Sequence, residues 1–386
     1  MTEGLPAAPP YGEGALSDLL PAVARSLDVE VPPAADGLSG LLRLEPTSRA
    51  CVLLVDGLGD LLLRERAGHA PFLRGLLDQV GTISAGFPTT TATSMGSLGT
   101  GLPPGSHGMV GYEVLVPEHD RLLNELSWDG GPDPRQWQRE TTVFQQAAAS
   151  GVEVVRVGPG YFDGSGLTEA ALRGGRFVAA SSLDDRVEAA LTALRSAPRT
   201  LVYVYWGDVD KIGHQEGCGS WQWGEELSKV DLAIRRLVAG LPADATLHVT
   251  ADHGMVDVPF EQRIDLAVDP DLAAGVRHAG GEPRAPQLYC EPGSADAVLA
   301  TWADALAGRA DVLSREQAVA AGWFGPVSPH VLPRIGDVVV ACRTGTAVVD
   351  SRRQRPQVLR LLGLHGSLTP QESLVPLLSV RGAGRG

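Results

Sequence analysis

The chain has 386 residues, of which 44% are hydrophobic and 20% are charged, so it is too apolar for an intrinsically disordered protein. Its formal net charge of −14 predicts an acidic surface that repels nucleic acid polymers, and we expect neither DNA nor RNA as a partner. No apolar run approaches the roughly 20 residues of a membrane span, and the first ten residues lack the pattern of a secretory signal. We therefore expect no membrane association and a cytoplasmic location.

Residues 1–45 read as a lead-in segment in which Pro-rich stretches surround one helix over residues 16–24. After residue 45, short β-branched runs alternate with longer segments rich in Ala, Leu and Arg. Such continuous apolar runs are typical of parallel strands that helices cover on both faces. The sequence thus predicts an α/β core, residues 46–258 and 336–386, built on a mostly parallel sheet. The predicted strands are 51–55, 152–157, 201–205, 246–250 and 337–341, and the clearest helices are 184–195 and 225–239.

The pattern changes between residues 259 and 335, where Pro and Gly are frequent. A predicted strand over 286–290 precedes a predicted helix over 295–306. We interpret this stretch as an inserted cap subdomain that packs over the main sheet.

Potential metal ligands follow three of the predicted strands. Asp56 ends the first run, Asp210 lies shortly after the strand at 201–205, and Asp252 and His253 follow the strand at 246–250. Ligands of open parallel sheets bind beyond the carboxyl ends of the strands. A single acid at such a place is more often a helix N-cap, but three together favour a shared site.

The segment DKIGH places Asp210 and His214 four residues apart, which puts both side chains on one face of a helical turn where one divalent ion could bind both. Asp208 is offset by two residues and is left out. For Asp252 and His253, an Asp turn beside a surface histidine is the alternative. His365 stands alone near the end of the chain, where a histidine is usually just exposed.

A run of three threonines, residues 89–91, opens a segment rich in Ala, Ser and Gly. Hydroxyls and free N–H groups at a helix N-terminus form an anion site. A hydroxyl becomes a good nucleophile only when a base or a metal lowers its pKa. The alternative is a small-residue helix that packs tightly against the sheet, which would leave the threonines at its start unexplained.

Taken in order, the motifs VDG at Asp56, FPTTTATS at Thr91, SHGMVGY from Ser106, DKIGH, ADHG and a final HG at His365 resemble the alkaline phosphatase superfamily. The branch is the type I phosphodiesterase/nucleotide pyrophosphatase family, and the resemblance runs from about residue 51 to the C-terminus. It implies a phosphodiesterase with two divalent ions, Mn²⁺ or Zn²⁺. The resemblance further implies one ion on Asp56, Asp252, His253 and Thr91, and the other on Asp210, His214 and His365.

Thr91 matches the nucleophile of the family, with Thr90 as the alternative. The resemblance implies that Thr91 attacks phosphorus in line and that water then hydrolyses the phosphothreonine. The sequence departs from the family at Tyr112, where the nucleotide pyrophosphatases have an Asn that binds a phosphate oxygen. The Tyr112 phenol or the amide of Asn124 could replace it. The arginine with which alkaline phosphatases grip a monoester has no clear counterpart, which weakens a monoesterase assignment.

The chain is also similar to actinobacterial cytoplasmic phosphodiesterases of cyclic di-AMP turnover. This implies a small nucleotide substrate such as the linear dinucleotide pApA, which would be cleaved to AMP. We expect Arg284, in the Gly/Pro-rich loop GGEPRAP, to be exposed; a surface arginine without a role is the more common case, but if the cap folds over the metals Arg284 is best placed to bind a terminal phosphate. The alternatives are a phosphomonoesterase or phosphonate hydrolase on the same scaffold, and a catalytically silent nucleotide sensor.

Overall fold

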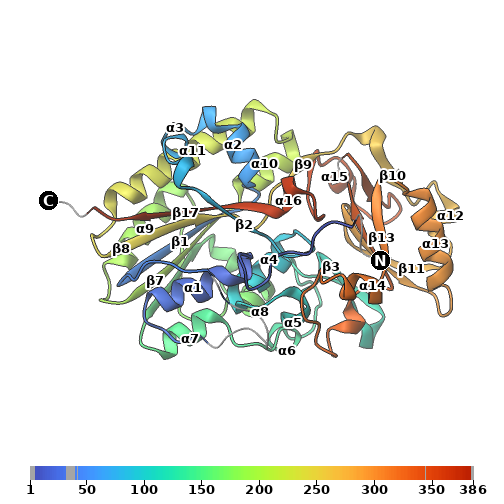
Figure 1. Ribbon diagram of the computed structural model, residues 1–386, viewed down its shortest axis with the longest axis horizontal. Coiled ribbons are helices and arrows are strands. Elements are labelled where there is room, and N and C mark those ends of the chain that lie inside the picture. The colour runs from blue at the N-terminus through green and yellow to red at the C-terminus, as the bar shows by residue number, and fades with distance from the viewer. Residues whose placement is uncertain (1–4, 32–39, 41, 344, 384–386) are drawn as a thin grey trace.

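The computed structural model describes residues 5–31, 40, 42–343 and 345–383, and its largest element is a seven-stranded sheet (Figure 1). Strands β8, β1, β7, β5 and β6 are parallel neighbours, and β17 pairs antiparallel with both β8 and β2. The predicted mostly parallel α/β sheet is therefore confirmed. Its strands are β1 (Arg49–Val55), β2 (Gly81–Ser84), β5 (Glu153–Gly158), β6 (Arg176–Ala179), β7 (Thr200–Trp206), β8 (Ala245–Thr250) and β17 (Leu374–Arg381).

Helices cover both faces of this sheet (Figure 1). The helices predicted over 184–195 and 225–239 are present as α9 and α11, which pack together on one face. That face carries α2 (Asp60–Glu65), α3 (Pro71–Arg74), α9 (Leu183–Leu194), α10 (Asp208–Glu216) and α11 (Trp221–Gly240). The other carries α1 (Leu19–Ser26), α4 (Thr91–Thr100), α7 (Val143–Ala149) and α8 (Gly166–Ala171).

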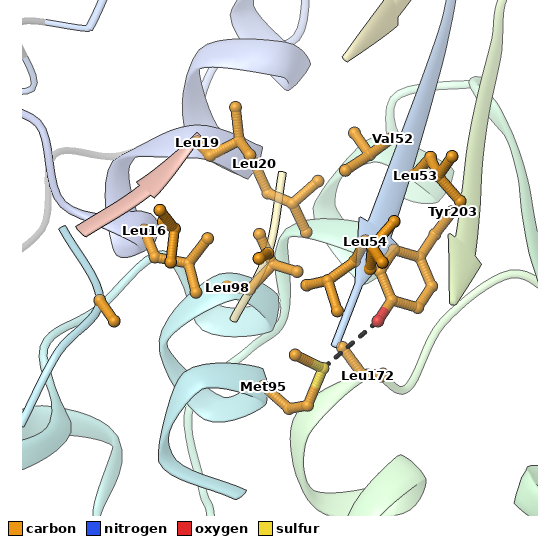
Figure 2. Close-up of a cluster of buried hydrophobic side chains, with 14 of the residues drawn as sticks. Leu16, Leu19, Leu20, Val52, Leu53, Leu54, Met95, Leu98, Leu172 and Tyr203 are labelled. Carbon is orange, nitrogen blue, oxygen red and sulfur yellow. Dashed lines mark hydrogen bonds between the residues drawn. The ribbon is translucent and has the colours of Figure 1, made fainter. Parts of the chain in front are cut away.

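The lead-in segment contributes to the main core. Its predicted helix is formed by a 3-10 turn, Leu16–Asp18, followed by α1, and both bury leucines. Figure 2 shows these leucines beside Leu98 of α4 and Leu54 of β1. The Tyr203 hydroxyl of β7 donates to Met95 Sδ at 3.3 Å across the same cluster. Residues 32–37, most of the second Pro-rich stretch, lie outside the described residues.

A second sheet of four antiparallel strands, called the cap sheet below, stands beside the main one (Figure 1). It contains the predicted strand at 286–290, and α13 is the predicted helix at 295–306. The strand order is β11 (Val276–Glu282), β12 (Ala285–Cys290), β14 (Val338–Cys342) and β13 (Ala310–Ser314), and the helices beside it are α12 (Pro270–Ala273), α13 (Ala295–Ala305) and α14 (Arg315–Ala320).

One strand assignment was wrong. The run at 337–341 was expected in the main parallel sheet, but it forms β14 of the cap sheet, beyond the predicted end of the insertion at residue 335. Val338 and Val340 pack into a separate core around Trp302, whereas Val339 and Ala341 face the main core. Because both faces of β14 are buried, its sequence is as uniformly apolar as that of a parallel strand.

None of the helices in the described chain has both the length and the apolar character needed to cross a membrane. The remaining strands and α-helices are short. Paired strands are β3 (Glu113–Val116) with β4 (Arg121–Asn124), β9 (Val256–Asp257) with β16 (Gly363–Leu364), and β10 (Arg263–Asp265) with β15 (Ala347–Val349). Short helices are α5 (Pro104–His107), α6 (Pro134–Trp137), α15 (Pro356–Leu359) and α16 (Pro370–Ser373).

Candidate metal centre

The three predicted acids meet at one edge of the main sheet because of strand register. In the parallel pairs of β1 with β7 and β8, Val55 lies beside Trp206 and Leu54 beside Thr250. The three strands therefore end together. Asp56 follows β1 directly, Asp252 follows β8 after one alanine, and α10, which carries Asp210, begins after a single glycine beyond β7.

Six predicted side chains form two adjacent groups. Asp56, Asp252 and His253 make one buried group, and Asp210, His214 and His365 make the other, and within each group potential ligand atoms lie within 4.8 Å of one another. The rings of His253 and His365 stack with their centroids 3.7 Å apart, so the two groups are neighbours. His365 is buried, although a lone histidine near the end of the chain was expected to be exposed more often.

The backbone orients all three imidazoles in the same way. Each Nδ1 lies within hydrogen-bonding distance of a main-chain carbonyl, to which it donates, and this leaves the lone pair of Nε2 directed at the carboxylates. Burial, with the neighbouring histidines, lowers the pKa of His365 well below its ordinary value, so this ring is neutral, as a metal ligand must be. The distances are 2.6 Å from His214 to Gly363, 3.1 Å from His253 to Gly254 and 2.8 Å from His365 to Thr89.

The carboxylates lack partners for the atoms that face inward. Asp56 Oδ1, Asp210 Oδ1 and Asp252 Oδ2 are buried without a hydrogen-bond donor among the described residues. Burial, followed by the charges of Asp252 and Asp210, raises the pKa of Asp56 well above its ordinary value, and burial also raises that of Asp252. Buried charges are normally paired or coordinate a metal. These oxygen and imidazole donors suit Zn²⁺ or Mn²⁺.

Thr91 is the first residue of α4, and its hydroxyl faces the first group. Thr91 Oγ1 lies 3.3 Å from His253 Nε2 and 3.5 Å from Asp56 Oδ2. The Thr90 side chain instead contacts Glu282, which comes from the cap sheet. Thr89 Oγ1 donates to the carbonyl of Ser367, so this threonine joins the start of α4 to the loop after His365.

Glycines allow these segments to approach one another. Gly57 has a φ of +73°, and a Cβ there would lie 2.9 Å from the Cα of Asp210. A Cβ on Gly254 would lie 2.0 Å from the carbonyl oxygen of Gln371. Any side chain at these two positions would clash with the neighbouring segment, which explains the glycines of the VDG and ADHG motifs.

A cavity of about 500 Å³ opens beside the two groups, with Asp56, Thr91 and Asp210 among its lining residues. Most of its wall is apolar. Its aromatic part was not predicted from the sequence. The Tyr205 hydroxyl donates to Asp56 Oδ2, and its ring lies 5.3 Å from that of Phe162. The signal was available in the aromatic pair at residues 161–162, which follows a predicted strand and a Gly-Pro-Gly turn. The aromatic lining residues are Tyr161, Phe162, Tyr203 and Tyr205.

Tyr112 and Asn124 lie next to each other at the cap side of the site. The Asn124 side chain hydrogen-bonds the Tyr112 phenol, and its Oδ1 accepts the N–H groups of Leu126 and Ser127 at 3.0 Å. Asn124 thus closes a turn, as a polar loop asparagine often does. Tyr112 is half-buried and lies close to Glu282 and Glu113.

Arg284 is not the exposed guanidinium that we expected. Its side chain is fully buried and pairs with the carboxylate of Glu372 through two bonds of 2.7 Å. It also donates to the carbonyls of Cys342, Arg343 and Thr346. These hydrogen bonds join the β11–β12 hairpin to α16 and to residues 342–346. Gly and Pro in the loop predict exposure, whereas in the structure they form a turn that points into the protein.

Glu282, two residues before Arg284, also reaches the site, and no pattern in the sequence predicts this. It is 7% exposed, hydrogen-bonds Thr90, and leaves Oε1 without a partner among the described residues. Burial raises its pKa well above the ordinary value, and Glu113 and Asp210 add to this. Only the antiparallel pairing of β11 and β12 brings it to the site.

Comparison with known proteins gives a consistent result. Residues 50–368 match the family model described as type I phosphodiesterase / nucleotide pyrophosphatase. Human ectonucleotide pyrophosphatase/phosphodiesterase family member 5 is 25% identical over 251 residues, which cover 60% of this chain and 50% of the human protein. An uncharacterised pyrophosphatase/phosphodiesterase of Schizosaccharomyces pombe is 27% identical over 203 residues, 50% of this chain and 40% of the yeast protein. The matched parts thus span about half of these curated relatives or less.

Two solved structures show the same fold. Murine ectonucleotide pyrophosphatase/phosphodiesterase 5 has a TM-score of 0.67 at 21% identity, covering 85% of this chain and 87% of the murine one. Phosphonoacetate hydrolase from Sinorhizobium meliloti 1021, in complex with phosphonoacetate, has a TM-score of 0.67 at 20% identity, covering 87% of this chain and 92% of the other.

Proposed function

The chain belongs to the type I phosphodiesterase / nucleotide pyrophosphatase family, and from this premise we propose that it hydrolyses small nucleotide phosphodiesters with Thr91 as the nucleophile. The observation that carries the proposal is the position of the Thr91 hydroxyl. It faces the first acid and histidine group at the N-terminus of α4, where main-chain N–H groups favour an anion.

The two groups of acids and histidines are proposed to hold two divalent ions, Zn²⁺ or Mn²⁺. The buried oxygens without partners and the preset Nε2 atoms support this assignment. Bound ions would neutralise the phosphate oxygens and lower the pKa of the Thr91 hydroxyl. The Thr91 hydroxyl gives up its proton to water, and its oxygen bonds to phosphorus while the bond to the leaving oxygen breaks and that oxygen takes up a proton. Water then hydrolyses the phosphothreonine, which releases the nucleoside monophosphate and restores the Thr91 hydroxyl.

The aromatic cavity supports a nucleotide as the substrate. Its walls are mostly apolar, and a nucleobase can stack on aromatic rings such as those of Phe162 and Tyr205. An inactive variant of the murine structural neighbour was solved in complex with AMP. We propose a short linear dinucleotide such as pApA as the substrate, with Tyr112 at the place of the family's phosphate-binding asparagine.

The test is hydrolysis by protein loaded with Mn²⁺ or with Zn²⁺. Bis(p-nitrophenyl) phosphate reports diesterase activity, p-nitrophenyl phosphate reports monoesterase activity, and phosphonoacetate tests the chemistry of the second structural neighbour. We expect turnover of the diester, loss of it in Thr91→Ala, and AMP as the product from pApA. Faster hydrolysis of the monoester or of phosphonoacetate would overturn the proposal, and binding without turnover would favour a sensor.

A further inference from the structure

Two parts of the chain outside the aromatic cavity reach the cap side of the site. The first is the turn between β11 and β12, which brings the buried Glu282 against Thr90. The turn also touches the loop of His365, because a Cβ on Gly366 would lie 2.7 Å from the Cβ of Glu282. Glu282 Oε1 has no hydrogen-bond donor among the described residues, and a buried acceptor without a donor is costly.

The second part is the segment from residue 351 to 360, called the basic segment below. It contains four of the arginines of this acidic chain, and no acid occurs between residues 351 and 371. Arg352 pairs with Asp350, and Arg353 donates to the carbonyl of Ala279 in the cap sheet. Arg355, at the start of α15, is exposed, and within the described chain its guanidinium has no ion pair and no hydrogen bond.

The basic segment is held in place relative to the metal centre. The chain runs from α15 into β16, where the N–H of Leu362 donates to the carbonyl of His214 at 2.6 Å and the carbonyl of Gly363 accepts from the ring of His214. Tyr112 lies between the two parts, because a Cβ on Gly280, two residues before Glu282, would lie 2.7 Å from the carbonyl oxygen of Glu113, the residue after Tyr112. Its half-buried phenol interacts electrostatically with both Glu282 and Arg355. An acceptor, a phenol and an unpaired cation therefore lie together on the cap side of the site.

We propose that Glu282, Tyr112 and Arg355 form a subsite for the leaving group, and that this leaving group is a ribonucleoside with its own phosphate. The inference rests on the proposed function. The oxygens of a phosphodiester only accept hydrogen bonds, so the donors nearest the scissile bond are sugar hydroxyls. Glu282 accepts the hydroxyl beside the leaving oxygen, and Arg355 binds the phosphate at the far end of the sugar.

The first test compares pApA with ApA, which lacks the terminal phosphate. In the metal-loaded enzyme, Arg355→Ala should lower the ratio of kcat/KM for pApA over ApA by about tenfold, the effect of one charge-assisted contact. Arg381→Ala is the matched control, because Arg381 is an exposed arginine on β17 that pairs with Thr246 at the opposite end of β8. It should keep the wild-type ratio. An unchanged ratio in Arg355→Ala would overturn the assignment of Arg355.

The second test uses pApA with a deoxyribose in the leaving nucleoside. The wild type should prefer the ribose form, Glu282→Ala should lose this preference severalfold, and Glu282→Gln, which keeps an acceptor, should restore it. An equal preference in Glu282→Ala would overturn the role of Glu282.

Equilibrium binding of pApA and ApA to Thr91→Ala separates the two proposals. If the wild type fails to hydrolyse bis(p-nitrophenyl) phosphate, the proposed function is wrong. The subsite is still supported if Arg355→Ala in the Thr91→Ala background weakens only the binding of pApA, and refuted if it weakens neither ligand or both equally.

Discussion

Replacing Asp252 by Asn should stabilise the metal-free protein while it destroys metal binding. The Oδ1 atom of Asp252 accepts the main-chain N–H groups of Gly57 and His253 at 3.1 and 3.0 Å, and an asparagine keeps both bonds. Only the buried Oδ2, which has no donor among the described residues, becomes an NH₂ group. That group can donate to Asp56, whose charge then meets only that of Asp210.

The magnitude follows from the spacing. Two unit charges 4.8 Å apart, the limit within the group, repel by about 3.5 kcal/mol at an effective dielectric constant of ~20. The raised pKa values of Asp56 and Asp252 mean that protonation relieves part of this repulsion. In the metal-free state at pH 8, we therefore expect the free energy of unfolding of Asp252→Asn to exceed that of the wild type by about 2 kcal/mol. A chain of 386 residues has an unfolding entropy of roughly 0.8 kcal/mol/K, so the Tm should rise by about 2–3 °C.

Metal reverses the order. At a free metal concentration of 100 times Kd, each bound ion should raise the free energy of unfolding of the wild type by about 2.7 kcal/mol. In Asp252→Asn, the ion at the group of Asp56, Asp252 and His253 should raise it much less. The pH dependence has a fixed sign. A carboxyl whose folded pKa is raised costs stability as pH rises above the unfolded value near 4, so the advantage of Asp252→Asn should shrink between pH 8 and pH 5.

Thermal melts in EDTA and in Mn²⁺ or Zn²⁺, at pH 8 and pH 5, measure all of these effects, and metal content and diester turnover are followed in the same samples. A lower Tm for Asp252→Asn in EDTA at pH 8 would refute the reasoning. The ionised carboxylate would then hold the fold together through its bonds to Gly57 and His253.

Three further predictions concern single side chains. Thr91→Ala should abolish turnover and keep nearly the wild-type metal content, because the acids and histidines remain, and activity lost in Thr90→Ala but kept in Thr91→Ala would reverse the assignment. His365→Ala should lose one of two ions by elemental analysis, together with activity, and a full complement of metal would remove His365 from the site. Arg284→Ala should lower the free energy of unfolding by about 3–5 kcal/mol in urea, because it leaves the carboxylate of Glu372 buried and unpaired, and an unchanged midpoint would contradict this.

The sequence was sufficient to place a candidate ligand wherever its position depends on the end of a strand. Asp56 and Asp252 could be placed together because parallel strands in register end at one edge, and the i, i+4 spacing of Asp210 and His214 needs only one turn of helix. His365 was different, since nothing local placed it. Only the resemblance brought it to the site, and in the structure the stacking of its ring on His253 shows how close the two groups are.

The errors arose where tertiary pairing decides. The apolar run of β14 has two buried faces from two different cores, so its composition could not distinguish an antiparallel cap strand from a parallel core strand. Arg284 and Glu282 stand two residues apart in one turn, yet both are buried, one beside Glu372 and the other beside Thr90. A Gly/Pro-rich loop has no periodicity, so its sequence does not indicate that Glu372 lies opposite Arg284.

The pair of Arg284 and Glu372 also divides the cap into a part that tolerates sequence change and a part that does not. Arg284 fixes the hairpin turn to the core by two buried hydrogen bonds to Glu372, so a substitution there disturbs folding. Among the exposed residues of the basic segment, Arg355 makes no such contact in the described chain, and exposed loops tolerate substitution easily. The proposed phosphate contact of Arg355 could therefore be exchanged by substitution, while the turn and the acids and histidines beneath it stay unchanged.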